Sequence, residues 1–134
     1  MVTLDVAKRM IEAVEKKARE IGQPMVAVVV DAGANMVALH RMDNAFLVSL
    51  DIATQKAYTA VAIQMPTHEV APLVQPGASL YGLTTTDKCR IVAFGGGFPI
   101  KDKDGKIVGG LGVSGGSVEQ DMTCAEAGLA VFEG

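Results

Sequence analysis

The chain has 134 residues, of which 49% are hydrophobic, 20% charged and 4% aromatic. That length suits one domain with a sizeable core, and the composition excludes intrinsic disorder. The formal net charge of −3, without any basic cluster, argues against nucleic-acid binding, which needs a positive face. No apolar run suits a membrane span and no signal peptide is apparent. We therefore expect a single domain over residues 1–134, located in the cytoplasm.

The first half of the chain predicts a helix, two strands and a second helix. Apolar residues recur every three or four positions over residues 4–21, and Thr3 is the expected N-cap. The aliphatic run 25–31 predicts a strand that is buried on both faces, and residues 36–42 predict the return strand after a turn. A helix is expected over residues 46–64, where a stripe of alanines allows close packing on a sheet.

The second half predicts a short helix, three further strands and a last helix. Residues 89–94 predict one of these strands. The dipeptide Asp104-Gly105 is typical of a type I′ turn, so its flanking segments are expected to form a hairpin. Ser117 and Gln120 have the spacing of a capping box, which predicts that the last helix begins there.

The predicted order is therefore α-β-β-α-(α)-β-β-β-α. Five strands that are mainly joined by hairpins and covered by helices predict an α+β sandwich with a five-stranded, mainly antiparallel sheet. Among such folds, the profilin-like arrangement fits this order best.

Glycine is concentrated between residues 95 and 116, where nine of the fifteen glycines lie. Glycine is used where the backbone needs a positive φ, or where a ligand or another segment comes close. A glycine-rich turn that leads into a helix gathers N–H groups that favour an anion. Residues 110–115 match G-x-G-x-x-G, but no room follows for the second strand and acidic residue of a dinucleotide-binding fold. These glycines therefore predict an anion cradle.

Three segments resemble the GlcG/HbpS family, which also occurs as the C-terminal domain of PduO-type cobalamin adenosyltransferases. They are VDAGANMVALHRMD at 30–43, IATQKAYTA at 52–60, and the glycine-rich stretch 95–128. One departure is the turn at Ala34-Asn35, where members often carry a second glycine. The resemblance covers nearly the whole chain. It implies a profilin-like domain that forms even-numbered homo-oligomers, such as octamers.

The family resemblance also implies a range of functions. Some members bind haem or other tetrapyrroles, and others are encoded beside enzymes of glycolate, propanediol or glycerol utilisation. We therefore expect a small-molecule-binding accessory protein of catabolic or cofactor metabolism, with haem, another tetrapyrrole or a small organic acid as ligand. Two alternatives stay open, an enzyme acting on a small hydroxy or keto acid and a purely structural oligomerisation module. Because no reaction is attached to most members, we lean towards a protein that is not an enzyme.

The candidate ligand-binding residues lie in the matching motifs. They are Arg41, Asp43, Lys56, Gly95, Gly96, Gly97, Pro99, Gly115, Gly116 and Asp121. Arg41 and Lys56 could hold a carboxylate or propionate, and glycine N–H groups could complete the cradle. We therefore expect a pocket for a small anion, which lies between residues 95–97, residues 41–43 and the start of the last helix. The alternative is a buried network in which Arg41 and Lys56 pair with aspartates of the same chain.

The chain has two histidines, His40 and His68. His40 shares a strand face with Met42, and histidine and methionine are both axial ligands of haem iron. His40 is therefore the candidate haem ligand, although a packed or surface histidine is the more common case. His68, at a predicted helix start, is expected to be exposed. No local pattern identifies a catalytic residue.

Overall fold

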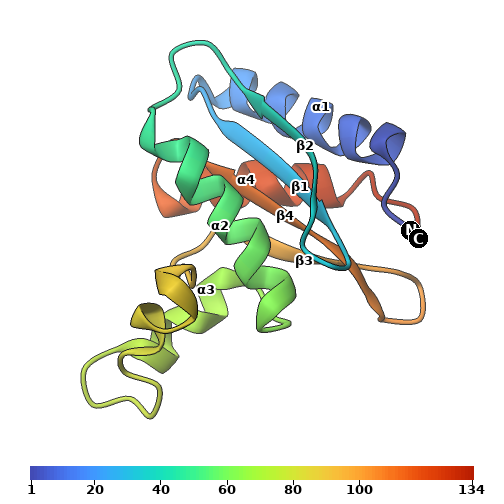
Figure 1. Ribbon diagram of the computed structural model, residues 1–134. Helices are drawn as coiled ribbons and strands as arrows, with labels where there is room; N and C mark the ends of the chain where they lie inside the picture. Colours follow the sequence, from blue (N-terminus) through green and yellow to red (C-terminus); the bar gives the residue numbers. More distant parts are fainter.

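The computed structural model describes residues 1–134, in which helices cover both faces of one four-stranded sheet (Figure 1). The helices are α1 (Leu4–Ile21), α2 (Val48–Ala62), α3 (Thr67–Val70) and α4 (Val118–Leu129). The strands are β1 (Val26–Asp31), β2 (Met36–Arg41), β3 (Gly97–Lys101) and β4 (Ile107–Ser114). Helices α1 and α4 pack on one face of the sheet and α2 on the other. The α+β class is therefore confirmed.

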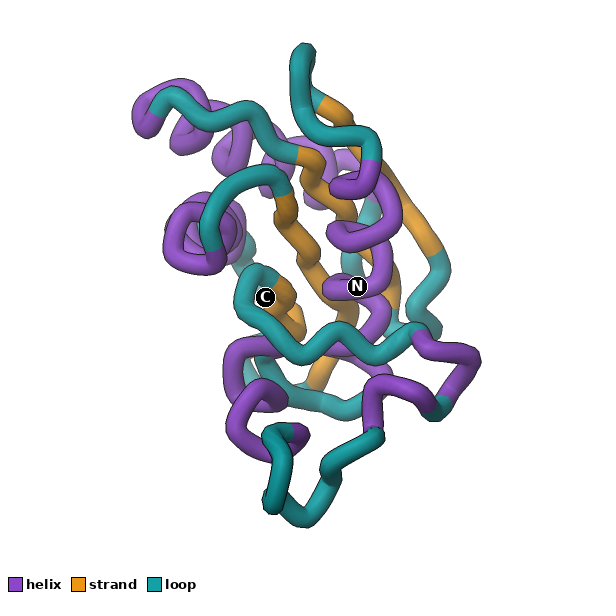
Figure 2. The backbone as a smooth tube through the Cα atoms, turned by 90° about the vertical axis from the view of Figure 1, so that its left-hand side faces the viewer, coloured by secondary structure: helices purple, strands orange, loops and turns teal.

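The sheet has the order β2-β1-β4-β3 (Figure 1), and every neighbouring pair is antiparallel. Figure 2 shows helices on both sides of the strands. Central strand β1 is buried on both faces, as its aliphatic run predicts. Ala27 and Val29 belong to the core beneath α1 and α4, whereas Val26, Val28 and Val30 belong to a smaller core beneath α2. Strands β2 and β3 are the two edges of the sheet.

The predicted fifth strand, residues 89–94, is wrong. Asp87, Lys88 and Cys89 have φ values of 51°, 57° and 60°, so the chain enters this segment through a left-handed turn, and residues 90–94 then pair with no strand of the sheet. The segment then runs along α2. The Thr59 hydroxyl donates to the carbonyl of Arg90 at 3.2 Å and accepts from the N–H of Val92 at 3.0 Å. The Thr59 side chain thus makes the hydrogen bonds to this backbone that a neighbouring strand would otherwise make.

The hairpin between β3 and β4 is confirmed, but the predicted type I′ turn is wrong. That turn needs a positive φ at both central residues, and Asp104 does not have one, whereas Gly105 has a φ of 82°. The turn is instead arranged by Asp102, whose Oδ1 accepts from the N–H groups of Asp104 and Lys106 at 2.9 Å each.

The predicted helix ends agree closely with the structure. Thr3 accepts a hydrogen bond from the N–H of Val6 at 3.2 Å, and both bonds of the Ser117–Gln120 capping box are present. Helix α2 begins at Val48, two residues later than the predicted start at Phe46, and it ends two residues earlier than predicted. These capping hydrogen bonds fix the residues at which α1 and α4 begin.

A row of glycines lets α2 lie directly on the sheet. Gly110 and Gly112 of β4 face α2, and Gly97 of β3 pairs with Gly112. A Cβ atom on Gly110 would lie 2.5 Å from the carbonyl oxygen of Ala57, and one on Gly97 would lie 2.5 Å from that of Lys56. At Gly112 the Cβ would overlap the carbonyl oxygen of Ala53. Three of the nine clustered glycines therefore serve close packing between helix and sheet.

Candidate functional site

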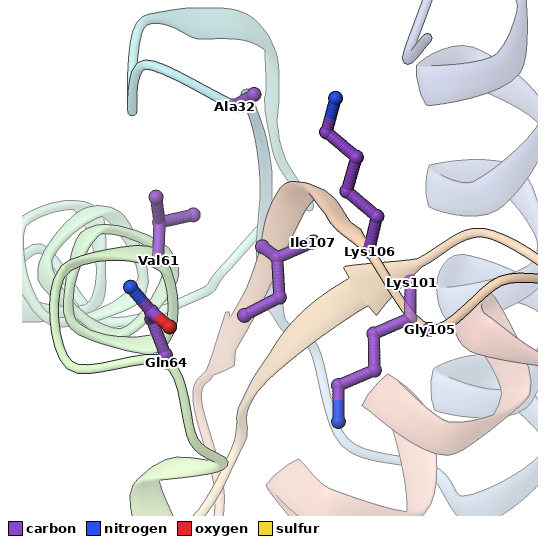
Figure 3. Close-up of a pocket in the computed structure, with 7 residues that line it drawn as sticks. All are labelled: Ala32, Val61, Gln64, Lys101, Gly105, Lys106 and Ile107. Atoms are coloured by element: carbon purple, nitrogen blue, oxygen red, sulfur yellow. The ribbon is translucent and has the colours of Figure 1, made fainter.

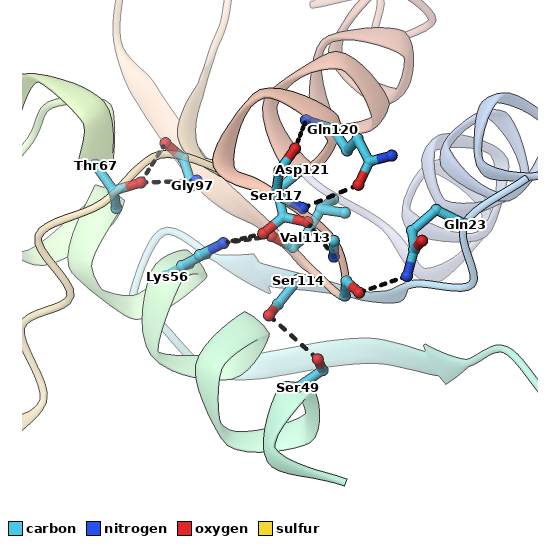
Figure 4. A network of polar contacts seen from close by, with 12 residues as sticks. Gln23, Ser49, Lys56, Thr67, Gly97, Val113, Ser114, Ser117, Gln120 and Asp121 are labelled. Atoms are coloured by element: carbon cyan, nitrogen blue, oxygen red, sulfur yellow. Dashed lines mark hydrogen bonds and ion pairs between the residues drawn. The ribbon is translucent and has the colours of Figure 1, made fainter. Parts of the chain in front are cut away.

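Lys56 is fully buried at the centre of a polar network (Figure 4). The side chain extends from α2, and its ammonium group donates to the carbonyl of Val113 at 2.9 Å and to Asp121 Oδ2 at 2.8 Å. The bond to Val113 reaches the end of β4, and Asp121 belongs to the first turn of α4. One lysine therefore ties α2, β4 and α4 together, from both sides of the sheet.

Asp121 is the anion that the glycine turn holds. Its Oδ1 accepts from the N–H of Gly116 at 2.9 Å, while Oδ2 pairs with Lys56. Burial raises the pKa of Asp121 and lowers the pKa of Lys56, and the attraction between the two charges opposes both shifts. For these residues, the structure has the geometry of the alternative drawn from the sequence, a buried ion pair within one chain.

The loop at Gly95–Gly97 packs against this network and leaves no cavity there. A Cβ atom on Gly96 would lie 2.6 Å from the carbonyl oxygen of Val113 and 2.7 Å from the Lys56 ammonium. The N–H of Gly97 donates to the buried Thr67 hydroxyl at 2.9 Å. None of the surface cavities is lined by residues 95–97. The loop therefore binds its own chain here, and Pro99, which follows it in β3, is buried as well.

Phe94 closes the network on its remaining side. Its ring centroid lies 5.1 Å from the Lys56 ammonium, in a cation–π contact, while 43% of the residue stays exposed. Acid–base chemistry by Lys56 or Asp121 would need this part of the structure to open, because the two residues are only 0% and 3% exposed. Cys124 is also buried, which raises the pKa of its thiol to about 11 and makes it a poor nucleophile.

The other two charged candidates lie outside this network. Arg41, at the end of edge strand β2, donates to the carbonyl of Ala45 at 3.2 Å. Arg41 and Asp43 are exposed and form no ion pair. Together they line a surface groove of about 400 Å³ with Glu15, Arg19 and Met42. The expected single pocket is thus split into a buried ion pair and an open, charged groove.

His40 lies beside this groove, on the face of β2 that is turned towards α1. Its side chain is 41% exposed, and Nδ1 lies 3.3 Å from Glu15 Oε2. A carboxylate at that place accepts from Nδ1–H, which leaves Nε2 as the free ring nitrogen. Met42, the residue just after β2, uses its sulfur to accept from the N–H of Met25 at 3.4 Å. His40 is therefore the more available of the two possible iron ligands.

The expectation that His68 is exposed is wrong. Its ring is half-buried against Phe98, with 5.6 Å between ring centroids, and Nδ1 is buried without a hydrogen-bond partner. No sequence pattern selects Glu15 and Arg19 as residues of a site. Helical periodicity places both on the polar side of α1, and no motif or spacing links that helix to β2.

The structure has neither a cluster of metal-binding side chains nor a membrane-spanning helix. No group of three or more His, Cys, Asp or Glu side chains is arranged to hold a metal ion. None of the helices has the length and the apolar character that crossing a bilayer requires.

The protein is a small α+β domain in which helices cover an antiparallel sheet, and it carries the buried Lys56–Asp121 pair and the charged groove beside His40. The chain belongs to the family described as haem degrading protein HbpS-like, whose model matches residues 2–130. It is 53% identical over 131 residues to an uncharacterized 15.0 kDa protein from the dhaT-dhaS intergenic region of Citrobacter freundii, covering 98% of this chain and 92% of that protein.

Two further similarities concern PduO. The chain is 45% identical over 120 residues to the corrinoid adenosyltransferase PduO of Salmonella typhimurium, covering 90% of this chain but only 35% of that enzyme. The crystal structure of a PduOC:haem complex superimposes with a TM-score of 0.92 at 42% identity, covering 96% of this chain and 92% of that one. The predicted relation to the HbpS-like and PduO C-terminal-like proteins is therefore confirmed.

Proposed function

We propose that this protein binds haem or a related tetrapyrrole as an accessory protein of catabolic or cofactor metabolism, with His40 as the iron ligand. The observation that carries the proposal is the partly exposed His40–Glu15 pair beside the groove lined by Arg19 and Arg41. Its support among similar proteins is the haem complex of the PduO domain. A carboxylate on the second ring nitrogen fixes the imidazole and raises its basicity as a ligand.

The groove next to His40 has charges that suit the edge of a haem. Arg19 and Arg41 are both exposed, and neither guanidinium forms an ion pair within the chain. Arginine binds carboxylates through two parallel hydrogen bonds, which suits a haem propionate. Asp43, which also lines this groove, limits how much negative charge can enter.

Haem titration of the purified protein tests this proposal. The wild type should develop a shifted Soret band, and His40→Ala should weaken haem binding about tenfold or more, because iron loses its protein ligand. Glu15→Gln should weaken binding while keeping a histidine-ligated spectrum. His68→Ala is the control and should bind like the wild type. A His40→Ala variant with unchanged Soret maximum and affinity would remove His40 from the site.

We also propose that the protein works as a homo-oligomer with an even number of subunits. Three consecutive apolar residues at the start of α2 are largely exposed: Phe46, Leu47 and Val48, at 63%, 79% and 60%. Exposed apolar side chains in such a run mark a protein–protein contact. Light scattering should therefore give a multiple of the 13.9 kDa chain mass, and Leu47→Asp should lower it. A wild-type mass of one chain at micromolar concentration contradicts this prediction.

A further inference from the structure

Residues 71–90 form an arm that projects from the domain near the C-terminal end of α2 (Figure 1, Figure 2). Its backbone consists of turns and short 3₁₀ helices, and none of its residues is buried. A hydrogen bond of 3.0 Å from the N–H of Leu80 to the carbonyl of Leu73 closes the arm on itself. The arm contributes no residue to either core of the domain.

The base of the arm is fastened to α2 by three side chains. The Tyr58 hydroxyl of α2 donates to Asp87 Oδ2 at 2.6 Å, and the Arg90 guanidinium pairs with Asp87 Oδ1. The same guanidinium lies 4.3 Å from the centroid of the Tyr58 ring. These contacts fix the position of an arm that has no core of its own.

The arm has the composition of an interface rather than of a solvated loop. Residues 71–86 include no charged side chain, although each of them is exposed or half-buried. Leu80 and Tyr81 are 44% and 69% exposed. Few charged residues and exposed aromatic ones are typical of the centre of a protein–protein interface. The surface beyond α2 is different, because its groove carries Lys101 and Lys106 (Figure 3).

The exposed apolar patch of Phe46–Val48 lies at the other end of α2 and complements the arm. Asp51, in the first turn of α2 beside this patch, is exposed and forms no ion pair. In the arm, Asp87 and Arg90 pair with each other, which leaves Lys88 as its one charged side chain without an ion pair. The two surfaces therefore match in apolar character and carry opposite free charges.

A second copy of the chain can bring the two surfaces together twice. Because the arm and the patch lie at opposite ends of one helix, a two-fold axis across the middle of α2 would place the arm of each copy on the patch of the other. Such a contact closes as a dimer, which is a unit of even-numbered assemblies. A stable interface takes about 20–30 residues from each partner, and residues 71–90 with Phe46–Val48 come close to that number.

We propose that the arm of residues 71–90 docks on the Phe46–Val48 patch of a second copy of this chain, with Lys88 facing the partner subunit's Asp51. No other protein is needed to cover either surface, because each copy carries both halves of the contact. This inference rests on the homo-oligomer proposed above and names the surfaces that form it.

Charge reversal tests the pairing of Lys88 with Asp51. Sedimentation velocity over a dilution series measures the concentration at which the assembly dissociates. Asp51→Lys and Lys88→Asp should each raise that concentration about tenfold, because each brings like charges together. The double variant restores an opposite pair and should assemble about as well as the wild type. Lys106→Asp is the matched control, since Lys106 is an exposed lysine outside both surfaces, and it should leave the assembly unchanged.

Cysteine cross-linking tests the contact itself. In a Cys89→Ser background, where the remaining Cys124 is buried, Leu47→Cys mixed with Tyr81→Cys should form covalent dimers with a short bis-maleimide, in higher yield than either variant alone. The inference is overturned, while the homo-oligomer stands, if the wild type assembles but the mixture gives no such dimers, or if the double charge variant assembles no better than the single ones. A wild type with the mass of one chain overturns both.

Discussion

Replacing Lys56 by methionine should lower the free energy of unfolding by about 3–5 kcal/mol. Methionine fills a similar volume, so the loss comes mainly from the charge of Asp121. In the variant this buried carboxylate keeps its hydrogen bond from Gly116 but loses the cation 2.8 Å away. Urea denaturation followed by circular dichroism measures the difference. The start of α4 and the loop at Gly95–Gly97 should also exchange their amide hydrogens faster, because both pack on this pair.

Two controls separate the ion pair from general effects of losing a lysine. Lys17→Met removes a lysine whose exposed ion pair with Glu20 should contribute less than about 1 kcal/mol. Adding Asp121→Asn to Lys56→Met removes the unpaired charge, so the double variant should be more stable than Lys56→Met alone. The explanation fails if Lys56→Met costs no more than Lys17→Met, or if the two changes at Lys56 and Asp121 are simply additive.

The parts of the fold that could be predicted from the sequence are those determined by residues close to one another along the chain. Helix α1 follows from its apolar period and its Thr3 cap, and α4 from the capping box at Ser117. Strand β1 follows from its run of aliphatic residues, which is typical of a strand buried on both faces. Residues 89–94 carry the same kind of signal but lie along α2, because Thr59 bonds to their backbone. Nothing within the segment itself reveals that contact.

The site could be predicted only in part, because its contacts join distant residues. Lys56 and Asp121 are 65 positions apart, and Glu15 is 25 positions from His40. The family motifs placed Lys56, Asp121 and the glycines in one group with Arg41 and Asp43, but they could not show whether the anion among them was a ligand or Asp121 itself. The glycines were ambiguous for the same reason, since glycine permits the close approach of a ligand and of a helix equally well. Only the position of α2 distinguishes the two.

Gly112→Ala should lower the free energy of unfolding by about 3 kcal/mol or more. The added methyl group would overlap the carbonyl oxygen of Ala53 and approach the backbone nitrogen of Ala57 to 2.6 Å, and neither backbone atom can move without shifting α2. Gly112 does not have a positive φ, so the cost is one of space rather than of backbone conformation. Urea denaturation measures the loss, and amide hydrogen exchange should show α2 as the element that opens first.

The matched control is Gly77→Ala. Gly77 has a φ of 89° and no atom within 4 Å of an added Cβ, so its replacement should cost only about 1 kcal/mol of backbone strain. If both variants lose the same stability, the glycines of β4 serve backbone conformation and the close packing of α2 is not what requires them. If Gly112→Ala loses much more, Gly97, Gly110 and Gly112 are required because α2 rests on the backbone of β3 and β4. Lys56 then reaches Asp121 past the end of β4 only because the helix lies so close to the strands.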